Sequence, residues 1–244
     1  MIETLPEAGS SNTVLADRLR DGSHVPEGFW LRAERQTAGR GRAGRAWLGA
    51  PGNLYCSTVV HLQQEDHAAH TLSLIAGLAV HDLLRSQLIN GNLRLPGEQR
   101  WLKWPNDILL HGAKLAGILC ERVADAVIVG IGINVAHAPD VPGRATTCIH
   151  RENGRNANDP ARVLGYLVDP FAHRLAHWRA RPLAATLAEW EERAHPRGTA
   201  LAVTDGDTRI HGTFDGLEPD GALRLALVDG STRIIHAGDV ELED

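Results

Sequence analysis

The stretch Trp101-Leu-Lys-Trp-Pro-Asn-Asp-Ile-Leu-Leu-His-Gly-Ala-Lys-Leu-Ala-Gly117 contains both lysines of a 244-residue chain in which the other 23 of 25 basic residues are arginines. An ammonium group is a compact point charge with three donors, whereas a guanidinium is a planar fork. Because Lys103 and Lys114 flank one Trp-Pro-Asn-Asp turn, we interpret them as residues that hold a carboxylate or a phosphate. The alternative is a biased composition that left two lysines by chance, and their clustering favours function.

The overall composition is that of an ordinary globular protein, with 43% hydrophobic and 23% charged residues. No apolar run of about 18 residues and no basic-apolar leader is visible, so we expect a cytoplasmic protein without a membrane anchor. Cys56, Cys120 and Cys148 are far apart and are interpreted as buried thiols in a reducing compartment. The net charge of −5 argues against wholesale nucleic-acid binding. We interpret the 13 histidines as solvated or core side chains and expect no metal site among them.

Hydrophobic periodicity predicts an α+β fold in which helices accompany a β-sheet. Helices are expected at about 12–20, at 68–88 and from Asp159-Pro160 to about residue 193, with a break at Pro182. Strands are expected at 28–34, 53–62, 100–104, 114–123 and 126–135. The last of these is so apolar that both of its faces must be covered. Residues 137–158 are expected to form a long loop and a candidate active-site lid.

The C-terminal segment has a different character. Four Asp-Gly pairs predict turns between short strands, at 205–206, 215–216, 220–221 and 229–230. We therefore predict a small antiparallel β-barrel at 196–244, appended to a larger domain at 1–195.

Residues 36–45, Gln-Thr-Ala-Gly-Arg-Gly-Arg-Ala-Gly-Arg, are too rich in glycine and arginine to continue a strand. Three guanidiniums in one loop can surround a polyanion the size of a nucleoside triphosphate, together with backbone N–H groups. The loop lacks the Gly-Lys-Ser/Thr ending of a Walker motif and does not open a helix as a dinucleotide fingerprint does. Taken alone, it fits a solvated turn or an RNA contact equally well.

The Pro105-Asn106-Asp107 corner is either a plain β-turn or a site for Mg²⁺, which one or two carboxylates and substrate oxygens commonly hold. Gly117 permits close approach of a ligand to the backbone. These parts together suggest chemistry in which a carboxylate attacks the α-phosphate of a nucleotide. Such a reaction needs charge neutralisation and alignment more than it needs a nucleophilic side chain.

Six segments, in this order and spacing, resemble the biotin protein ligase family. They are Ser10-Ser11-Asn12, Glu34 to Arg45 with Trp47, Gly52 to Ser57, Lys103 to Asp107, Lys114 to Leu119 and Gly130 to Asn134. The resemblance covers nearly the whole chain. It implies a catalytic domain with a mixed sheet, a C-terminal SH3-like β-barrel, and activation of biotin by ATP to biotinyl-5′-AMP before transfer to a lysine.

The resemblance also implies roles for individual residues. Lys114, Arg42 and Arg45 would be catalytic. The biotin site would comprise Ser10, Ser11, Asn12, Gln36, Gly39, Arg40, Gly41, Arg42, Lys114 and Gly117. The nucleotide would contact Arg42, Arg45, Trp47, Lys103, Asn106 and Asn134, and Asp107 would bind Mg²⁺.

The implied partner is the biotin carboxyl carrier domain of an acyl-CoA carboxylase, and relatives occur as monomers and as homodimers. Because the ligase motifs start by Ser10, we expect no preceding DNA-binding domain and no DNA binding. The nearest rival is a lipoate or octanoyl transferase of the same fold, whose loop would read Arg-Arg-x-Ser-Gly-Gly-Gly instead of Arg35-Gln-Thr-Ala-Gly. A non-catalytic RNA-binding module is a second rival, which the acidic net charge disfavours.

Overall fold

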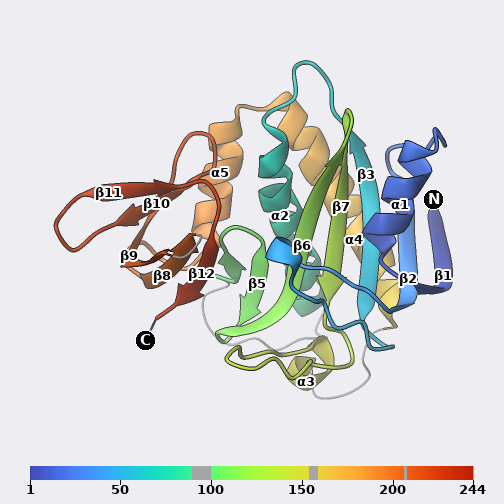
Figure 1. The fold of residues 1–244 in the computed structure, drawn as a ribbon, viewed down its shortest axis with the longest axis horizontal. Helices are drawn as coiled ribbons and strands as arrows, with labels where there is room; N and C mark the ends of the chain where they lie inside the picture. The colour runs from blue at the N-terminus through green and yellow to red at the C-terminus, as the bar shows by residue number, and fades with distance from the viewer. Residues whose placement is uncertain (90–99, 154–158, 206–207, 244) are drawn as a thin grey trace.

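The computed structural model describes residues 1–89, 100–153, 159–205 and 208–243. Its central sheet has seven strands in the order β1-β2-β3-β7-β6-β5-β4, with β1 and β2 parallel and the other neighbours antiparallel (Figure 1). The expected mixed sheet is therefore confirmed. The strands are β1 (Ile2–Ala8), β2 (Trp30–Gln36), β3 (Leu54–His61), β4 (Leu102–Lys103), β5 (Asp107–Leu110), β6 (Ala113–Val123) and β7 (Ala126–Ile133).

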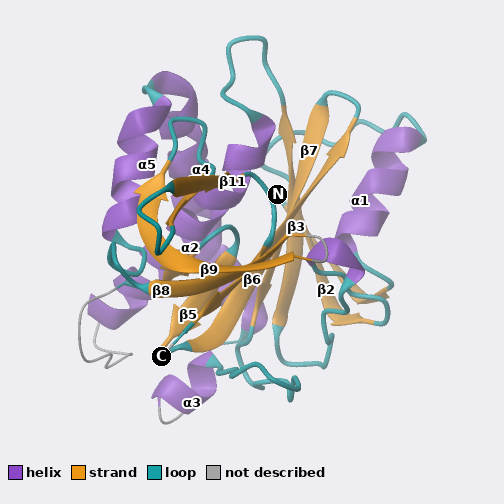
Figure 2. Cartoon of the chain, turned by 60° about the vertical axis from the view of Figure 1, so that its left-hand side comes forward, coloured by secondary structure: helices purple, strands orange, loops and turns teal. Residues whose placement is uncertain are grey.

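Helices cover both faces of this sheet (Figure 2). On one face α1 packs through Leu15 against Leu31, Val59 and Ile128. On the other face lie α2 and α4, whose apolar side chains join one large core. The helices are α1 (Ser11–Arg20), α2 (Leu72–Ile89), α3 (Ile149–Asn153), α4 (Pro160–Ala180) and α5 (Leu183–Glu192), with 3₁₀ turns at η1 (Arg42–Gly44) and η2 (Ala69–Thr71). No helix in the described ranges is long and apolar enough to cross a membrane.

Helix α2 is apolar on almost every side. Its buried side chains include Leu74, Ile75, Leu78 and Leu83, which do not fall on one stripe. A helix of this composition is stable in water only if it is enclosed. The sheet on one side and α4 on the other enclose it, so α2 forms the centre of the core.

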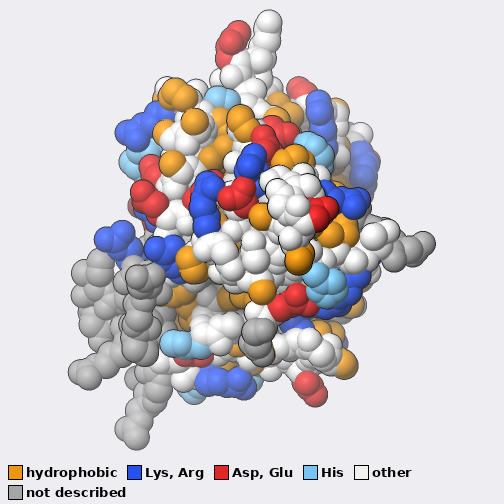
Figure 3. Space-filling view, turned by 90° about the vertical axis from the view of Figure 1, so that its left-hand side faces the viewer, with side chains coloured by type: hydrophobic (Ala, Val, Ile, Leu, Met, Phe, Trp, Pro, Cys, Tyr) orange, Lys and Arg blue, Asp and Glu red, His pale blue; other side chains and the backbone are white. Residues whose placement is uncertain are grey.

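A second sheet contains five antiparallel strands in the order β11-β10-β9-β8-β12. Its core residue Phe214 belongs to the same hydrophobic cluster as Trp190 of α5, and Trp104 donates a hydrogen bond from Nε1 to the Gly221 carbonyl at 3.0 Å. Acidic and basic side chains are interspersed on the side of the molecule where this sheet lies (Figure 3). The strands are β8 (Ala200–Asp205), β9 (Thr208–Leu217), β10 (Leu223–Ala226), β11 (Thr232–Ile235) and β12 (Asp239–Leu242).

The small β-structure predicted after residue 195 is confirmed as this sheet, in which β11 and β12 are the two edges. The Asp-Gly pairs at 220–221 and 229–230 are turns, as expected. The prediction for Asp215-Gly216 is wrong, because both residues lie within β9. Gly216 has a φ of +93°, and the pairing of β9 with β10 shifts register nearby, so this glycine allows an irregularity inside a strand. The pair at 205–206 extends outside the described residues.

Three elements were not expected from the sequence. Strand β1 carries two glutamates and Pro6 and has no alternating apolar pattern, which an edge strand tolerates. Strand β5 occupies only Asp107–Leu110, directly after the Pro105-Asn106 corner, so the corner joins β4 to β5. Helix α3 lies inside the segment 137–158, of which residues 154–158 are outside the described range.

Candidate active site

A cavity of about 400 Å³ lies on the face of the central sheet that carries α1. It exists because two neighbouring strands, β6 and β7, present glycines there. In β7, Ile131 and Ile133 point into the α2 core, so Gly130 and Gly132 alternate onto the α1 face. Gly132 pairs with Gly117 of β6, and because neither glycine has a side chain, a hollow remains in the middle of the sheet.

The indole of Trp47 packs on this glycine floor. A Cβ atom at Gly132 would lie 2.6 Å from the Trp47 ring, and one at Gly117 would lie 2.8 Å from it. Both distances are shorter than any ordinary contact, so the ring requires glycine in both strands. Among the described residues none accepts a hydrogen bond from the buried Trp47 Nε1, and Lys114 Nζ lies 5.2 Å from the ring centroid.

The start of α1 closes one end of the cavity through a hydrogen-bond network. Gln36 Oε1 accepts from the backbone N–H of Ser11 at 2.8 Å and from its hydroxyl at 3.1 Å. The Ser57 hydroxyl is fully buried. It lies at donor distance from two acceptors, Ser11 Oγ (2.7 Å) and Asn12 Oδ1 (2.6 Å). A Cβ at Gly130 would lie 2.2 Å from Asn12 Oδ1, so this glycine makes room for the asparagine.

The two lysines meet at one buried carboxylate. Asp107 lies 2.6 Å from Lys114 Nζ and 3.2 Å from Lys103 Nζ, and it is 5% exposed. Burial by itself raises the pKa of Asp107, but the charges of the two lysines outweigh it and hold the pKa below its usual value. Burial lowers the pKa of Lys114, and Asp107 only partly offsets this effect. Lys114 is therefore a desolvated ammonium at the cavity wall.

Lys103 has a different position from that expected. Its ammonium is buried and donates to the Val240 carbonyl of β12 at 2.7 Å, and the residue does not line the cavity. It ties the C-terminal sheet to Asp107. Gly39 also lies outside the cavity lining. A Cβ there would lie 2.5 Å from the Trp47 carbonyl oxygen, so glycine at this position lets the backbone at 39 and at 47 approach closely.

The arginines of the loop at 36–45 diverge. Arg40 donates to Thr13 at 3.0 Å and to Glu121 at 3.1 Å. Arg45 bonds Asp239 of β12. Arg42 reaches Asn106 Oδ1 only at 3.5 Å, and among the described residues no carboxylate lies within ion-pair distance of it. Burial lowers the pKa of Arg42, and the charge of Asp107 only partly offsets this effect. An anion bound beside Arg42 would therefore stabilise its positive charge.

Two asparagines of the predicted site organise the backbone. Asn106 Nδ2 donates to the Ile118 carbonyl at 2.7 Å. Asn134 Nδ2 donates to the Thr147 carbonyl at 3.0 Å and to that of Lys114 at 3.3 Å, which holds the loop after β7 against β6. This loop supplies Pro139, Val141, Pro142, Arg144 and Thr146 to the cavity wall.

The structure thus brings most of the predicted site residues to one cavity. Those that line it are Ser10, Ser11, Asn12, Gln36, Arg40, Gly41, Arg42, Arg45, Trp47, Asn106, Asp107, Lys114, Gly117 and Asn134. The sequence did not point to Tyr55 and Arg144, which also line the cavity. The Tyr55 hydroxyl donates a hydrogen bond to the Ala50 carbonyl at 2.8 Å. Burial raises the pKa of Tyr55 to about 12, so the side chain is a neutral phenol that holds the loop in place.

The described residues do not form a protein-built metal centre. Asp107 faces two ammonium groups, and no group of three or more His, Cys, Asp or Glu side chains in the described ranges is placed to hold a metal ion. One histidine pair was overlooked in the sequence. His173 and His177 have His-x-x-x-His spacing on α4, with ring centroids 4.0 Å apart. These two histidines have no third ligand among the described residues.

This combination of a mixed sheet, a glycine-floored cavity and a cationic rim matches a known class of protein. The family model described as "Biotin/lipoate A/B protein ligase family" matches residues 9–136, and that of the "Biotin protein ligase C terminal domain" matches residues 200–243. The chain belongs to the biotin protein ligase branch of this family.

Individual relatives agree with this placement. A biotin--[acetyl-CoA-carboxylase] ligase of Paracoccus denitrificans is 37% identical over 234 residues, with 92% of this chain and 95% of the relative covered. The same enzyme of Mycobacterium tuberculosis is 35% identical over 98% of this chain and 88% of its own length. The solved structure of the Aquifex aeolicus biotin protein ligase in complex with biotin and ATP superposes with a TM-score of 0.81, at 28% identity and with 99% and 98% coverage.

Proposed function

We propose that this chain activates biotin with ATP to biotinyl-5′-AMP and transfers the biotinyl group to a lysine of the biotin carboxyl carrier domain of an acyl-CoA carboxylase. Two relatives named biotin--[acetyl-CoA-carboxylase] ligase, at 37% and 35% identity, match this chain over 95% and 88% of their own length. The observation that carries the proposal within the molecule is the position of Lys114. It is a desolvated ammonium at the wall of a cavity with surplus positive charge.

The first half-reaction joins two anions, so the protein must first neutralise their repulsion. The biotin carboxylate oxygen attacks the α-phosphorus of ATP, the P–O bond to the β-phosphate breaks, and pyrophosphate leaves. In our proposal Lys114 contacts both the carboxylate and the α-phosphate, while Arg42 and Arg45 face the polyphosphate. Because Asp107 holds Lys114 in place beforehand, little reorganisation is needed at the moment of reaction.

The ureido ring of biotin would occupy the end of the cavity near α1. Ser11, Gln36 and Ser57 there form a network of hydroxyl and amide groups that can pair with a urea-type ring. Trp47 covers this region, and its buried Nε1 donor would be satisfied by an acceptor on the ligand. Asn106 and Asn134 keep the surrounding backbone in place for the nucleotide.

Bound Mg²⁺ would supply charge neutralisation at the triphosphate, and Asp107 is the residue of this chain that would hold it. Asp107 remains the predicted protein ligand, although its present ion pairs suit the anchoring of Lys114. All other charge neutralisation in the proposal comes from the lysine and the arginines of the chain itself.

In the second half-reaction the ε-amine of the carrier lysine attacks the biotinyl carbonyl, and AMP leaves. The intermediate is a mixed anhydride that water also attacks, so the loops at 36–50 and 134–149 must exclude water until the carrier arrives. The three cysteines are free thiols, which suits the reducing cytoplasm, and we keep that location as part of the proposal.

Incorporation of biotin into a purified carrier domain tests the proposal directly. The intact chain is incubated with ATP, Mg²⁺ and either biotin, lipoate or octanoate, and the carrier mass is measured. We expect a biotin adduct only, and no adduct on a carrier whose acceptor lysine is replaced by arginine. An adduct from lipoate or octanoate in place of biotin would overturn the proposal in favour of the lipoyl-type rival. RNA binding without ATP turnover would overturn it in favour of a non-catalytic module.

A further inference from the structure

One carboxylate of the C-terminal sheet reaches the rim of the cavity. Asp239, the first residue of β12, accepts hydrogen bonds at Oδ2 from Arg45 and from Arg144, the latter at 3.1 Å. Arg45 belongs to the glycine-arginine loop and Arg144 to the loop after β7, and both line the cavity. One oxygen atom therefore joins three segments that are distant in the sequence.

The position of Asp239 is fixed relative to the reacting centre. The neighbouring residue Val240 is buried, and its carbonyl accepts from Lys103 Nζ at 2.7 Å. Lys103 in turn pairs with Asp107, which pairs with Lys114. A continuous set of polar contacts thus places the Asp239 carboxylate at a defined distance from the ammonium that faces the substrates.

Asp239 carries a negative charge where two cations converge. Burial raises its pKa, but the hydrogen bond from Arg45 and the charges of Arg45, Arg144 and Lys103 outweigh it, so the pKa lies below its usual value. The side chains are 42% (Arg45), 28% (Arg144) and 33% (Asp239) exposed. Ion pairs with this much exposure to solvent are weak and exchange readily with other anions.

We propose that Asp239 is a positioning residue that competes with the triphosphate of ATP for ion pairs with Arg45 and Arg144. While ATP is bound, the phosphates take the two arginines. Once pyrophosphate has left, Asp239 takes them back and draws both loops over the adenylate. The inference rests on the proposed ligase function.

The charge in the cavity changes when pyrophosphate leaves. Pyrophosphate removes most of the negative charge of ATP, and the adenylate retains a single phosphate, so two guanidiniums at the rim lose their partners. Asp239 is the carboxylate that pairs with both of them in the structure. Closure of the rim at this stage protects the mixed anhydride from water while leaving the earlier adenylyl transfer unaffected.

The variant Asp239→Asn tests the exchange because it removes the charge and keeps the shape. We expect biotin-dependent exchange of pyrophosphate with ATP to stay within about threefold of the intact chain. Release of AMP in the absence of carrier, which measures hydrolysis of the adenylate, should rise at least fivefold. Asp239→Glu restores the charge and should return AMP release toward the value of the intact chain.

Glu241→Gln is the matched control. It lies on the same strand, loses the same charge, and pairs only with Arg209 of the C-terminal sheet among the described residues, at 2.8 Å. It should alter neither measurement. In the double variant Asp239→Asn with Arg144→Gln, AMP release should not exceed the larger of the two single effects, because both changes break one bridge.

The outcomes separate this inference from the proposed function. Absence of pyrophosphate exchange in the intact chain overturns the proposed function itself. If the intact chain exchanges and Asp239→Asn releases AMP no faster than Glu241→Gln, the role of Asp239 is overturned. If Asp239→Asn is folded by circular dichroism but loses exchange, Asp239 acts in adenylation and the exchange model is equally overturned.

Discussion

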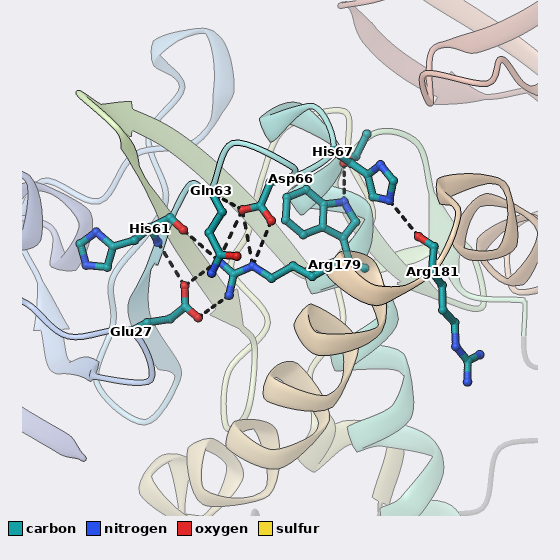
Figure 4. A network of polar contacts seen from close by, with 9 residues as sticks. Glu27, His61, Gln63, Asp66, His67, Arg179 and Arg181 are labelled. Atoms are coloured by element: carbon teal, nitrogen blue, oxygen red, sulfur yellow. Dashed lines mark hydrogen bonds and ion pairs between the residues drawn. The ribbon is translucent and has the colours of Figure 1, made fainter.

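Two networks of charged side chains, one around Arg179 and one around Asp107, differ in their balance of cations and anions. Far from the cavity, Arg179 of α4 donates to both Glu27 and Asp66 and to the His61 carbonyl (Figure 4). One cation there is shared by two carboxylates. At the cavity the ratio is reversed, because Lys103 and Lys114 share Asp107.

The cavity rim repeats this surplus of cations, since Arg45 and Arg144 share Asp239 and Arg42 has no carboxylate partner among the described residues. In a network that only stabilises the fold, carboxylates of the protein can neutralise the cation, as Glu27 and Asp66 do for Arg179. A network with unbalanced cations gains most when an external anion binds. The balance of charge, more than the residue types, therefore distinguishes the site from the scaffold.

The largest expected effect is that of Lys114→Met, which removes the ammonium and keeps the length of the side chain. We expect the rate of biotinyl-adenylate formation to fall by roughly 10³-fold. The free energy of unfolding should change by less than about 2 kcal/mol, because Lys103 still pairs with Asp107 and the buried charge of Lys114 is itself unfavourable. Pyrophosphate exchange and urea unfolding measure the two quantities. A normal rate would remove Lys114 from the chemistry.

The opposite result is expected for Arg179→Met in the scaffold network. Two carboxylates lose their shared partner, of which Asp66 has a side chain only 4% exposed, so the unfolding free energy should fall by about 2–3 kcal/mol. Activity per folded molecule should stay within about twofold. Arg20→Met, which breaks an exposed pair with Asp17, is the control and should change stability by less than about 0.5 kcal/mol. An equal loss in both variants would contradict the contrast.

The floor of the cavity is tested by Gly132→Ala. The added Cβ would overlap the Trp47 ring, which has nowhere to move without leaving the floor, so we expect about a 30-fold lower rate of adenylate formation, equivalent to about 2 kcal/mol. Gly165→Ala in α4, where a Cβ meets nothing within 4 Å, is the matched control. Retained activity in Gly132→Ala, with Trp47 fluorescence unchanged, would show that the contact is dispensable.

The smallest effect concerns pH. Burial raises the pKa of Asp82, but hydrogen bonds from His81 and Arg174 outweigh it and lower the pKa from 3.8 to about 2. This contribution to stability is therefore present above pH 4 and is lost as the pH falls toward 2. Asp82→Asn should cost about 1–2 kcal/mol at pH 6, and the difference from the intact chain should be roughly halved at pH 3. Urea unfolding at both pH values measures it, and a difference independent of pH would refute the assignment.

Periodicity in the sequence predicted those elements whose burial is one-sided or complete. The strand at 126–135 and the helix at 68–88 carry enough apolar residues to be recognised without tertiary information, and the structure confirms β7 and α2. Strand β1 was missed because an edge strand can contain Pro6 and exposed glutamates. Gly216 was misread because an Asp-Gly pair is equally compatible with a turn and with an irregular strand.

Short motifs likewise predicted the residues whose chemistry is unusual for the chain, namely Lys114 and the glycine-arginine loop. They could be recognised without a structure because lysine is rare in this arginine-rich chain and because glycines between arginines are unusual within a strand. Lys103 belonged to the same motif but lies beneath the cavity, since a motif gives the spacing of residues along the chain and not the side of the strand to which each points.

The sequence alone determined the chemistry of this protein: which cations are available, which glycines leave space, and which family they resemble. Only the tertiary structure decided which charges meet. Arg45 and Asp239 are 194 residues apart, and no local pattern relates them. Their contact depends on how the C-terminal sheet packs against β4 and α5, and that packing is a sum over many apolar contacts distributed along the whole chain.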